Sequence, residues 1–261
     1  MTLNNIRSTV TGGIGSLGVE VATGIMQSGG DVICIDHVQS PPLEQWKYLQ
    51  TLARVCSAQV WYYGCDITDI EATRALFQKA VAAARFPLRG LVTCAGISSL
   101  GRSIDFSIDE MRRIIDVNLT GTFVCAQSAA QEIFEQSLPA SIVLIASMSG
   151  HVVNKGLDTA AYSCSKSGVH QLTRNLASEW GSPENSPLIR VNSLSPGYIR
   201  TSMTEDLLKD PNTRHLMYEG SMLRRISEAD EYRGPVVFLL SDASSYMTGA
   251  DILVDGGYTG C

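Results

Sequence analysis

Short runs rich in β-branched residues alternate along this chain with longer helical patterns, and this alternation limits the possible folds more than any other feature. Strands are expected at Ile6–Val10, Asp31–Asp36, Gln59–Tyr63, Gly90–Thr93, Ser141–Ser147, Ile189–Leu194 and Asp251–Val254. Helices are expected at Ser16–Ser28, Leu43–Val55, Asp69–Arg85, Ile108–Ser137, Ala160–Trp180 and Glu228–Leu240. Because the central strands carry few polar residues, helices should cover both faces of a parallel sheet. The pattern predicts an α/β, doubly wound, Rossmann-type fold.

The 261 residues contain no repeat, low-complexity tract or linker that would divide them, so we expect a single domain over residues 1–261. Within it the pattern loosens over residues 201–225, which predicts a mobile flap at the substrate side. A hydrophobic fraction of 44% with 18% charged residues excludes a disordered chain. The net charge of −6 argues against nucleic acid as a partner, because phosphate backbones require a positive surface.

The cysteines indicate the compartment in which the chain works. They stand at positions 34, 56, 65, 94, 125, 164 and 261, form no CxxC pair and are odd in number. We therefore expect free, mostly buried thiols in a reducing compartment. The longest apolar runs are too short to span a membrane, and the first residues have no signal pattern. A cytoplasmic protein without a membrane partner is expected. His37, His170 and His215 show no metal spacing, so no metal is expected.

A glycine-rich turn, Thr11–Gly18 (TGGIGSLG), follows the first strand and opens a helix. Such a turn lets the backbone approach a pyrophosphate, and the helix N-terminus supplies free N–H groups. It predicts a dinucleotide site. Asp36 ends the second strand, where a carboxylate accepts hydrogen bonds from the ribose of NAD and repels the 2′-phosphate of NADP. We therefore favour NAD over NADP. Asp66, after the third strand, is expected near the adenine amino group.

Tyr162 and Lys166 are four residues apart in a helical pattern, so they share one helix face. A nearby ammonium favours phenolate and is expected to lower the pKa of Tyr162 from about 10, which would make it a usable acid and base. Ser147, at the end of an apolar strand, could hydrogen-bond the substrate oxygen that exchanges its proton with Tyr162. Ser149 is an alternative in that role.

Over essentially its whole length the sequence resembles the short-chain dehydrogenase/reductase family. The matching motifs are TGGIGSLG at 11–18, DVN at 116–118, AYSCSK at 161–166, RVN at 190–192, SPG at 195–197, and SD, TG and DGG at 241–242, 248–249 and 255–257. The chain departs from the family pattern at Ser16, where glycine is usual. It departs again at Thr93-Cys94, where the family has side-chain amides that brace the fourth strand.

The resemblance implies a role for each matched position. Tyr162 would be the general acid and base, Lys166 would hold the nicotinamide ribose and lower the Tyr162 pKa, Ser147 would orient the carbonyl, and Asn118 would help to hold a water chain. Cofactor contacts are expected at Gly12, Gly15, Ser16, Leu17, Gly18, Asp36, Asp66, Ile67, Cys94, Ala95, Gly96, Tyr162, Lys166, Pro196, Gly197, Ile199 and Thr201.

The expected activity is an NAD(H)-dependent exchange of a secondary alcohol and a ketone, both small molecules. Residues 146–154 look most like the fungal polyol and ketose branch, and Ser149, His151 and Tyr198 are substrate-side candidates; a structural hydrogen bond for His151 is an equal alternative. Methionines and leucines in the flap equally favour a bulkier apolar ketone, or packing of the flap itself. Two further alternatives are a biosynthetic enzyme repurposed for cyclisation or isomerisation and a non-catalytic NAD-binding protein. The resemblance implies a homotetramer or dimer.

Overall fold

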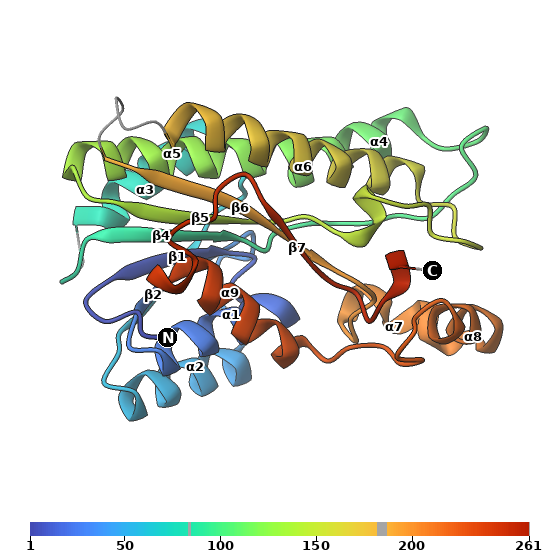
Figure 1. Ribbon diagram of the computed structural model, residues 1–261, viewed down its shortest axis with the longest axis horizontal. Helices are drawn as coiled ribbons and strands as arrows, with labels where there is room; N and C mark the ends of the chain where they lie inside the picture. The colour runs from blue at the N-terminus through green and yellow to red at the C-terminus, as the bar shows by residue number, and fades with distance from the viewer. Residues whose placement is uncertain (83–84, 182–186, 261) are drawn as a thin grey trace.

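The computed structural model describes residues 1–82, 85–181 and 187–260, and its centre is one seven-stranded parallel sheet (Figure 1). The strand order is β3-β2-β1-β4-β5-β6-β7. The strands are β1 (Arg7–Thr11), β2 (Asp31–Asp36), β3 (Val60–Gly64), β4 (Leu88–Thr93), β5 (Ala140–Ile145), β6 (Ile189–Pro196) and β7 (Asp251–Val254). Every neighbouring pair is parallel, so the predicted doubly wound α/β fold is confirmed.

Helices cover both faces of the sheet (Figure 1). One face carries α1 (Ser16–Gln27), α2 (Leu43–Val55) and α9 (Arg233–Leu240); the other carries α3 (Ile70–Ala82), α4 (Ile108–Ile115), α5 (Thr122–Gln136) and α6 (Ala160–Trp180). Alternate residues of a strand therefore enter different cores, as the two-residue period of a strand requires. Val92 packs into the first core and Leu91 into the second, and both are fully buried.

The strand order reverses between β1 and its neighbour β4, which are adjacent in the sheet although two strands lie between them in sequence. Beside this reversal the loops after the two strands leave in opposite directions and open a crevice at their carboxyl ends. Short 3-10 turns complete the fold: Met148–Gly150, Ala229–Tyr232, Asp242–Ser244 and Tyr258–Gly260.

For two predicted segments the structure adds detail that the sequence pattern did not give. The helix expected over Ile108–Ser137 is divided by a π-helical turn at Asp116–Gly121, which the sequence period does not distinguish from an α-helix. The flap expected over residues 201–225 contains two helices, α7 (Ser202–Lys209) and α8 (Pro211–Glu219), and its mobility stays a prediction. Leu208 and Met217 are buried in a small core of this segment, so part of its apolar content serves its own packing.

Within the described part of the chain, no helix combines the length and the apolar character needed to cross a membrane. The six cysteines there are free thiols: Cys34, Cys65 and Cys125 are buried, Cys56 and Cys94 are partly buried, and Cys164 is exposed. Cys261, like residues 83–84 at the end of the helix expected over Asp69–Arg85, lies outside the described residues.

Candidate active site

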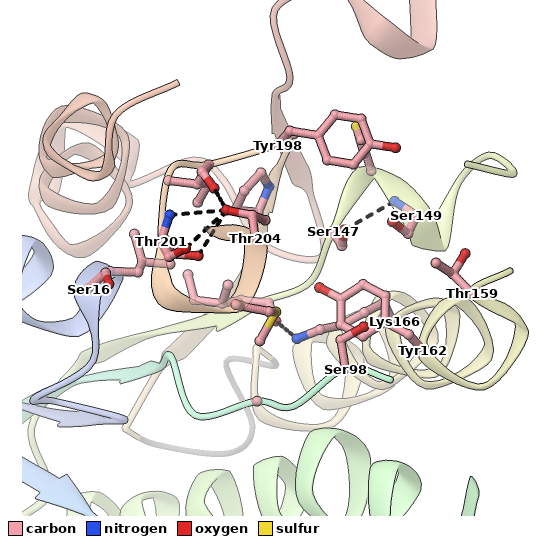
Figure 2. A pocket seen from close by; sticks show the side chains of 18 of the residues that line it. Ser16, Ser98, Ser147, Ser149, Thr159, Tyr162, Lys166, Tyr198, Thr201 and Thr204 are labelled. Atoms are coloured by element: carbon pink, nitrogen blue, oxygen red, sulfur yellow. Dashed lines mark hydrogen bonds between the residues drawn. The ribbon is translucent and has the colours of Figure 1, made fainter. Parts of the chain in front are cut away.

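A cavity of 370 Å³ lies at the carboxyl ends of the strands, between the glycine turn, the start of α6 and α7 (Figure 2). Its lining residues come from five segments: Gly12, Gly15, Ser16, Leu17 and Gly18; Cys94, Gly96, Ser98, Ser99 and Leu100; Ile145, Ala146, Ser147, Met148, Ser149, Asn154, Leu157 and Thr159; Tyr162 and Lys166; and Pro196, Gly197, Tyr198, Ile199, Thr201, Ser202, Met203, Thr204, Asp206 and Leu207. Its volume lies within the usual range for small-molecule sites.

The turn between β1 and α1 requires glycine at three of its positions, Gly12, Gly13 and Gly18. A Cβ on Gly13 would lie 2.7 Å from the Cys34 Cβ and 2.9 Å from the Val10 carbonyl oxygen. Gly12 has φ +62°, and a Cβ there would lie 2.7 Å from the Ala95 nitrogen. A Cβ on Gly18 would lie 2.0 Å from the Gly12 carbonyl oxygen. At Gly15 the nearest atom would be 3.3 Å away, and Ser16 is exposed at the first position of α1. The departure at Ser16 therefore places a hydroxyl at the mouth of the cavity without distorting the turn.

The N-terminus of α1 faces this cavity. Its N-cap residue, Gly15, has no side chain that could accept a hydrogen bond from the first N–H groups of the helix. Its first N–H groups are thus available to an anionic group. Together with the close backbone approach at Gly12 and Gly18, this cradle fits the pyrophosphate of a dinucleotide. The geometry agrees with the predicted dinucleotide site.

Asp36 lies beside the same turn at the end of β2. Its Oδ2 accepts a hydrogen bond from the Ile14 N–H at 3.3 Å, and its Oδ1 accepts one from the His37 N–H at 2.9 Å. The side chain is 11% exposed and does not line the cavity itself. Asp66 follows β3, where its Oδ1 accepts hydrogen bonds from the backbone and hydroxyl of Thr68. Asp36 is thus held against the glycine turn, whereas Asp66 is held by Thr68 within the loop after β3.

The end of β4 is braced by hydroxyls rather than by the amides that are usual in the family. The Thr11 hydroxyl accepts a hydrogen bond from the Ala95 N–H at 3.4 Å, and the Thr93 hydroxyl accepts one from the Ile145 N–H at 3.4 Å. β1, β4 and β5 are therefore joined at their carboxyl ends. The second departure from the family pattern leaves this edge of the sheet connected by two threonine side chains.

Asn118 lies in the π-helical turn and is fully buried. Its Oδ1 accepts a hydrogen bond from the Ile97 N–H at 2.8 Å, while its Nδ2 donates to the Ile97 carbonyl at 2.9 Å and to the Ser165 hydroxyl at 3.0 Å. The amide thus joins the segment after β4 to α6. Asn118 does not line the cavity but lies directly behind residues that do.

Ser147, Tyr162 and Lys166 meet at the cavity wall (Figure 2). Ser147 is two residues past β5, not within the strand as predicted, and its Oγ accepts a hydrogen bond from the Ser149 N–H at 3.1 Å. Tyr162 and Lys166 lie in the first two turns of α6. The Lys166 Nζ donates to the Ile145 carbonyl at 2.8 Å and lies 5.8 Å from the centroid of the Tyr162 ring.

The electrostatics of this group differ from the sequence expectation. Burial raises the pKa of Tyr162, and a hydrogen bond with Ser147 opposes this rise; the Lys166 ammonium is not among the causes. Burial also lowers the pKa of Lys166 to about 8. The predicted lowering of the Tyr162 pKa by Lys166 is therefore not seen, because the ammonium is directed at the Ile145 carbonyl. At neutral pH the phenol keeps its proton.

The segment after β6 completes the cavity. A Cβ on Gly197 would lie 2.7 Å from the Asp255 Cα, so this position requires glycine. Thr201 caps α7 in a reciprocal pair with Thr204, and the Thr204 hydroxyl donates to the Ile199 carbonyl at 2.5 Å (Figure 2). These hydrogen bonds hold the start of α7 against the cavity.

Of the three residues predicted on the substrate side, two line the cavity and one does not. Ser149 and Tyr198 line the cavity, and the Tyr198 hydroxyl accepts a hydrogen bond from the Asn154 Nδ2 at 3.0 Å. His151 does not line it; its Nε2 lies 2.8 Å from the Asp251 Oδ2. His151 therefore makes the structural hydrogen bond that was its alternative interpretation.

Several predicted cofactor residues also stand outside the cavity wall, namely Asp36, Asp66, Ile67 and Ala95. Lining residues that the sequence interpretation missed include Ser98, Ser99, Leu100, Leu157, Thr159 and Asp206. Ser98, Ser99 and Leu100 follow a parallel strand at the reversal of strand order, and that position alone could have identified them.

Comparison with known proteins gives concordant matches. A family model described as enoyl-(acyl carrier protein) reductase matches residues 12–259. A protein named short chain dehydrogenases/reductase notP′ from Aspergillus versicolor is 47% identical over 256 residues, which cover 98% of this chain and 88% of the relative. An NADH-dependent L-xylulose reductase from Ambrosiozyma monospora is 34% identical over 259 residues, covering 96% of this chain and 93% of the relative.

Among solved structures, an NADPH-dependent 3-quinuclidinone reductase from Rhodotorula rubra superposes with a TM-score of 0.89 at 30% identity. The match covers 100% of this chain and 93% of that one. The predicted resemblance to fungal ketose reductases is thus confirmed as a resemblance. The two reductases are named for different cofactors, one for NADH and the other for NADPH.

Proposed function

The chain belongs to the short-chain dehydrogenase/reductase family, and from that premise we propose that it is an NAD(H)-dependent oxidoreductase that interconverts a secondary alcohol and a ketone. One observation carries the proposal: Ser147, Tyr162 and Lys166 share the wall of a cavity that continues to the glycine turn at α1. A pyrophosphate at the turn and a carbonyl at Tyr162 would then occupy one continuous space.

A bound nicotinamide would supply the hydride when the ketone is reduced and accept it when the alcohol is oxidised. In reduction, the Ser147 hydroxyl holds the substrate oxygen and the Tyr162 hydroxyl gives its proton to that oxygen. At neutral pH the Tyr162 phenol carries the proton that reduction requires, although its raised pKa makes it a weaker acid than the sequence predicts. Lys166 faces the same space from the next turn of α6 and would hold the ribose hydroxyls.

Asp36 supports NAD as the preferred cofactor. Its carboxylate faces the glycine turn through the Ile14 N–H, where the hydroxyls of an adenosine ribose would lie. No Lys or Arg stands in the turn or at position 37 to neutralise a 2′-phosphate. We accordingly propose NAD rather than NADP.

For the substrate, the cavity wall supports a hydroxyketone or its polyol with an apolar portion. Ser98, Ser149 and Thr159 offer hydroxyls near Tyr162 (Figure 2). Leu100, Leu157, Met203 and Leu207 form an apolar part of the same wall. These apolar side chains also favour a bulkier ketone, which is the competing substrate class. Cyclisation or isomerisation of such a substrate is the alternative reaction.

The decisive test is oxidation of NADH on a panel of ketoses and bulky ketones, by wild type and by Tyr162→Phe. We expect turnover on one class to fall about 100- to 10,000-fold in the variant, with NADH affinity changed only a few-fold. Tyr198→Phe removes a hydroxyl from the same cavity and is the matched control. Unchanged turnover in Tyr162→Phe would reject the mechanism. Tight NADH binding with no turnover on any ketone would instead favour a non-catalytic binding protein.

A further inference from the structure

Outside the cavity, two histidines and an aspartate from distant parts of the chain converge. His151 follows the short turn after β5, His170 lies on α6, and Asp251 begins β7. One ligand atom from each lies within 4.8 Å of the others. The His151 Nε2 is 2.8 Å from the Asp251 Oδ2, and the His170 Nδ1 is 3.6 Å from the Asp251 Oδ1. Around a tetrahedral zinc ion, ligand atoms lie roughly 3.3 Å apart.

His170 leaves one ring nitrogen without a partner inside this cluster. Its Nε2 lies 3.3 Å from the Ser147 carbonyl, which can only accept, so this nitrogen carries the hydrogen. In a neutral imidazole, a hydrogen on Nε2 leaves a lone pair on Nδ1. That Nδ1 is buried and has no hydrogen-bond partner, although the Asp251 carboxylate faces it. A lone pair directed at a carboxylate is unfavourable unless a cation lies between them.

The surroundings already have the hydrogen bonds that usually orient metal ligands. The His170 Nε2–H points to a backbone carbonyl, as the second nitrogen of a ligating histidine commonly does. The Asp251 Oδ1 accepts hydrogen bonds from the hydroxyls of Ser193 at 2.6 Å and Ser195 at 2.8 Å. Both hydroxyls come from β6 and hold Oδ1, whereas the exposed His151 lies against the other oxygen, Oδ2.

We propose that His151, His170 and Asp251 form a binding site for a divalent transition-metal ion of the zinc type. Two imidazole nitrogens and one carboxylate oxygen suit zinc better than Mg²⁺ or Ca²⁺, which take oxygen ligands. Because His151 is exposed, the fourth position is open to a water molecule. None of the three residues lines the cavity, so the ion would act through structure by holding His170 against the Ser147 carbonyl.

His151 and His170 are 19 positions apart in sequence, and Asp251 follows His170 by 81 positions, so no short sequence motif predicts the site. Zinc uptake is therefore the direct test. Untagged, chelator-stripped protein is titrated with Zn²⁺ by calorimetry, and bound metal is measured after dialysis. We expect one equivalent per chain in wild type and at least about 100-fold weaker binding in His151→Ala. His215→Ala removes another exposed histidine, on α8, and should bind as wild type does.

Cobalt identifies the donor atoms. Substitution with Co²⁺ should give the visible bands of a tetrahedral site without the near-ultraviolet band of a thiolate ligand, which separates this site from binding at Cys164. If His151→Ala does not fold, Asp251→Asn serves as the second variant, with the same loss of binding expected. Absence of stoichiometric Zn²⁺ uptake by wild type, or equal uptake by wild type and the folded variant, would overturn the proposal. The outcome is independent of turnover and so of the proposed oxidoreductase activity.

Discussion

Replacement of Asp36 by asparagine should remove most of the preference for NADH over NADPH. The carboxylate is 11% exposed and faces the glycine turn, and asparagine keeps its shape while losing its charge. A hydrogen bond to a charged group contributes about 1.5–3 kcal/mol, so loss of one such bond to the ribose weakens NADH binding about 10- to 150-fold.

The effect on NADPH has the opposite sign. At a separation of about 5 Å and an effective dielectric constant near 20, the carboxylate repels each negative charge of a 2′-phosphate by about 3 kcal/mol. Removing that repulsion strengthens NADPH binding about 100-fold per charge. The two effects combine, so the ratio of the NADPH to the NADH dissociation constant should fall by at least about 1,000-fold.

The assay is titration of both reduced cofactors into each protein, followed by cofactor fluorescence. Asp66→Asn is the matched control, because it removes an equal charge at the end of the neighbouring strand, where the adenine common to both cofactors is expected. Its dissociation constants should change together and leave their ratio intact. A wild type that binds NADPH as tightly as NADH, or an unchanged ratio in Asp36→Asn, would refute the selector role of Asp36.

Three further expectations follow from the same contacts. Burial lowers the pKa of Lys166 to about 8, so its cationic form is lost above that pH. NADH affinity should therefore fall above pH 8 in wild type and stay level in Lys166→Arg, as cofactor titrations at several pH values would measure. Gly18→Ala should lower the thermal midpoint by about 2–12 °C, because its Cβ would meet the Gly12 carbonyl oxygen, while Gly15→Ala should change it little. The family resemblance implies a homotetramer or dimer, and Phe123 is 37% exposed on α5; light scattering should find an oligomer, and if α5 lies in its interface, Phe123→Asp should weaken it.

The sequence pattern predicts the bounds of a helix or strand best where the residues of that element carry the signal themselves. β2, α2, α6 and β7 have the bounds expected from the sequence, because each combines a clear apolar period with evident end signals. The two helices within residues 201–225 were not predicted, although the sequence holds a signal for one of them. Asp210-Pro211 is a helix start, with the Asp210 carboxylate capping the Thr213 N–H. The two helices are short, with eight and nine residues, and each buries a single side chain, so few positions indicate their period.

The candidate site was predictable as a set of residues but not as an electrostatic arrangement. The motif spacing assembled Ser147, Tyr162 and Lys166, and these do line one cavity. The direction of the Tyr162 pKa shift depends on burial and on which atom the Lys166 ammonium contacts, and neither can be obtained from spacing. Likewise, His151 was named as a substrate candidate because it follows the catalytic strand, whereas its turn directs it to Asp251.

One face of α6 connects these observations. Tyr162, Lys166 and His170 follow one another at four-residue intervals and so share that face. Tyr162 meets Ser147, the Lys166 Nζ holds the Ile145 carbonyl, and the His170 Nε2 faces the Ser147 carbonyl. The last residue of β5 and Ser147 are therefore both attached to α6 through their backbone carbonyls. The proposed chemistry of Tyr162 and Lys166 requires that Ser147 keep a fixed position, and His170, on the same helix face, contacts the Ser147 carbonyl and so helps to hold it.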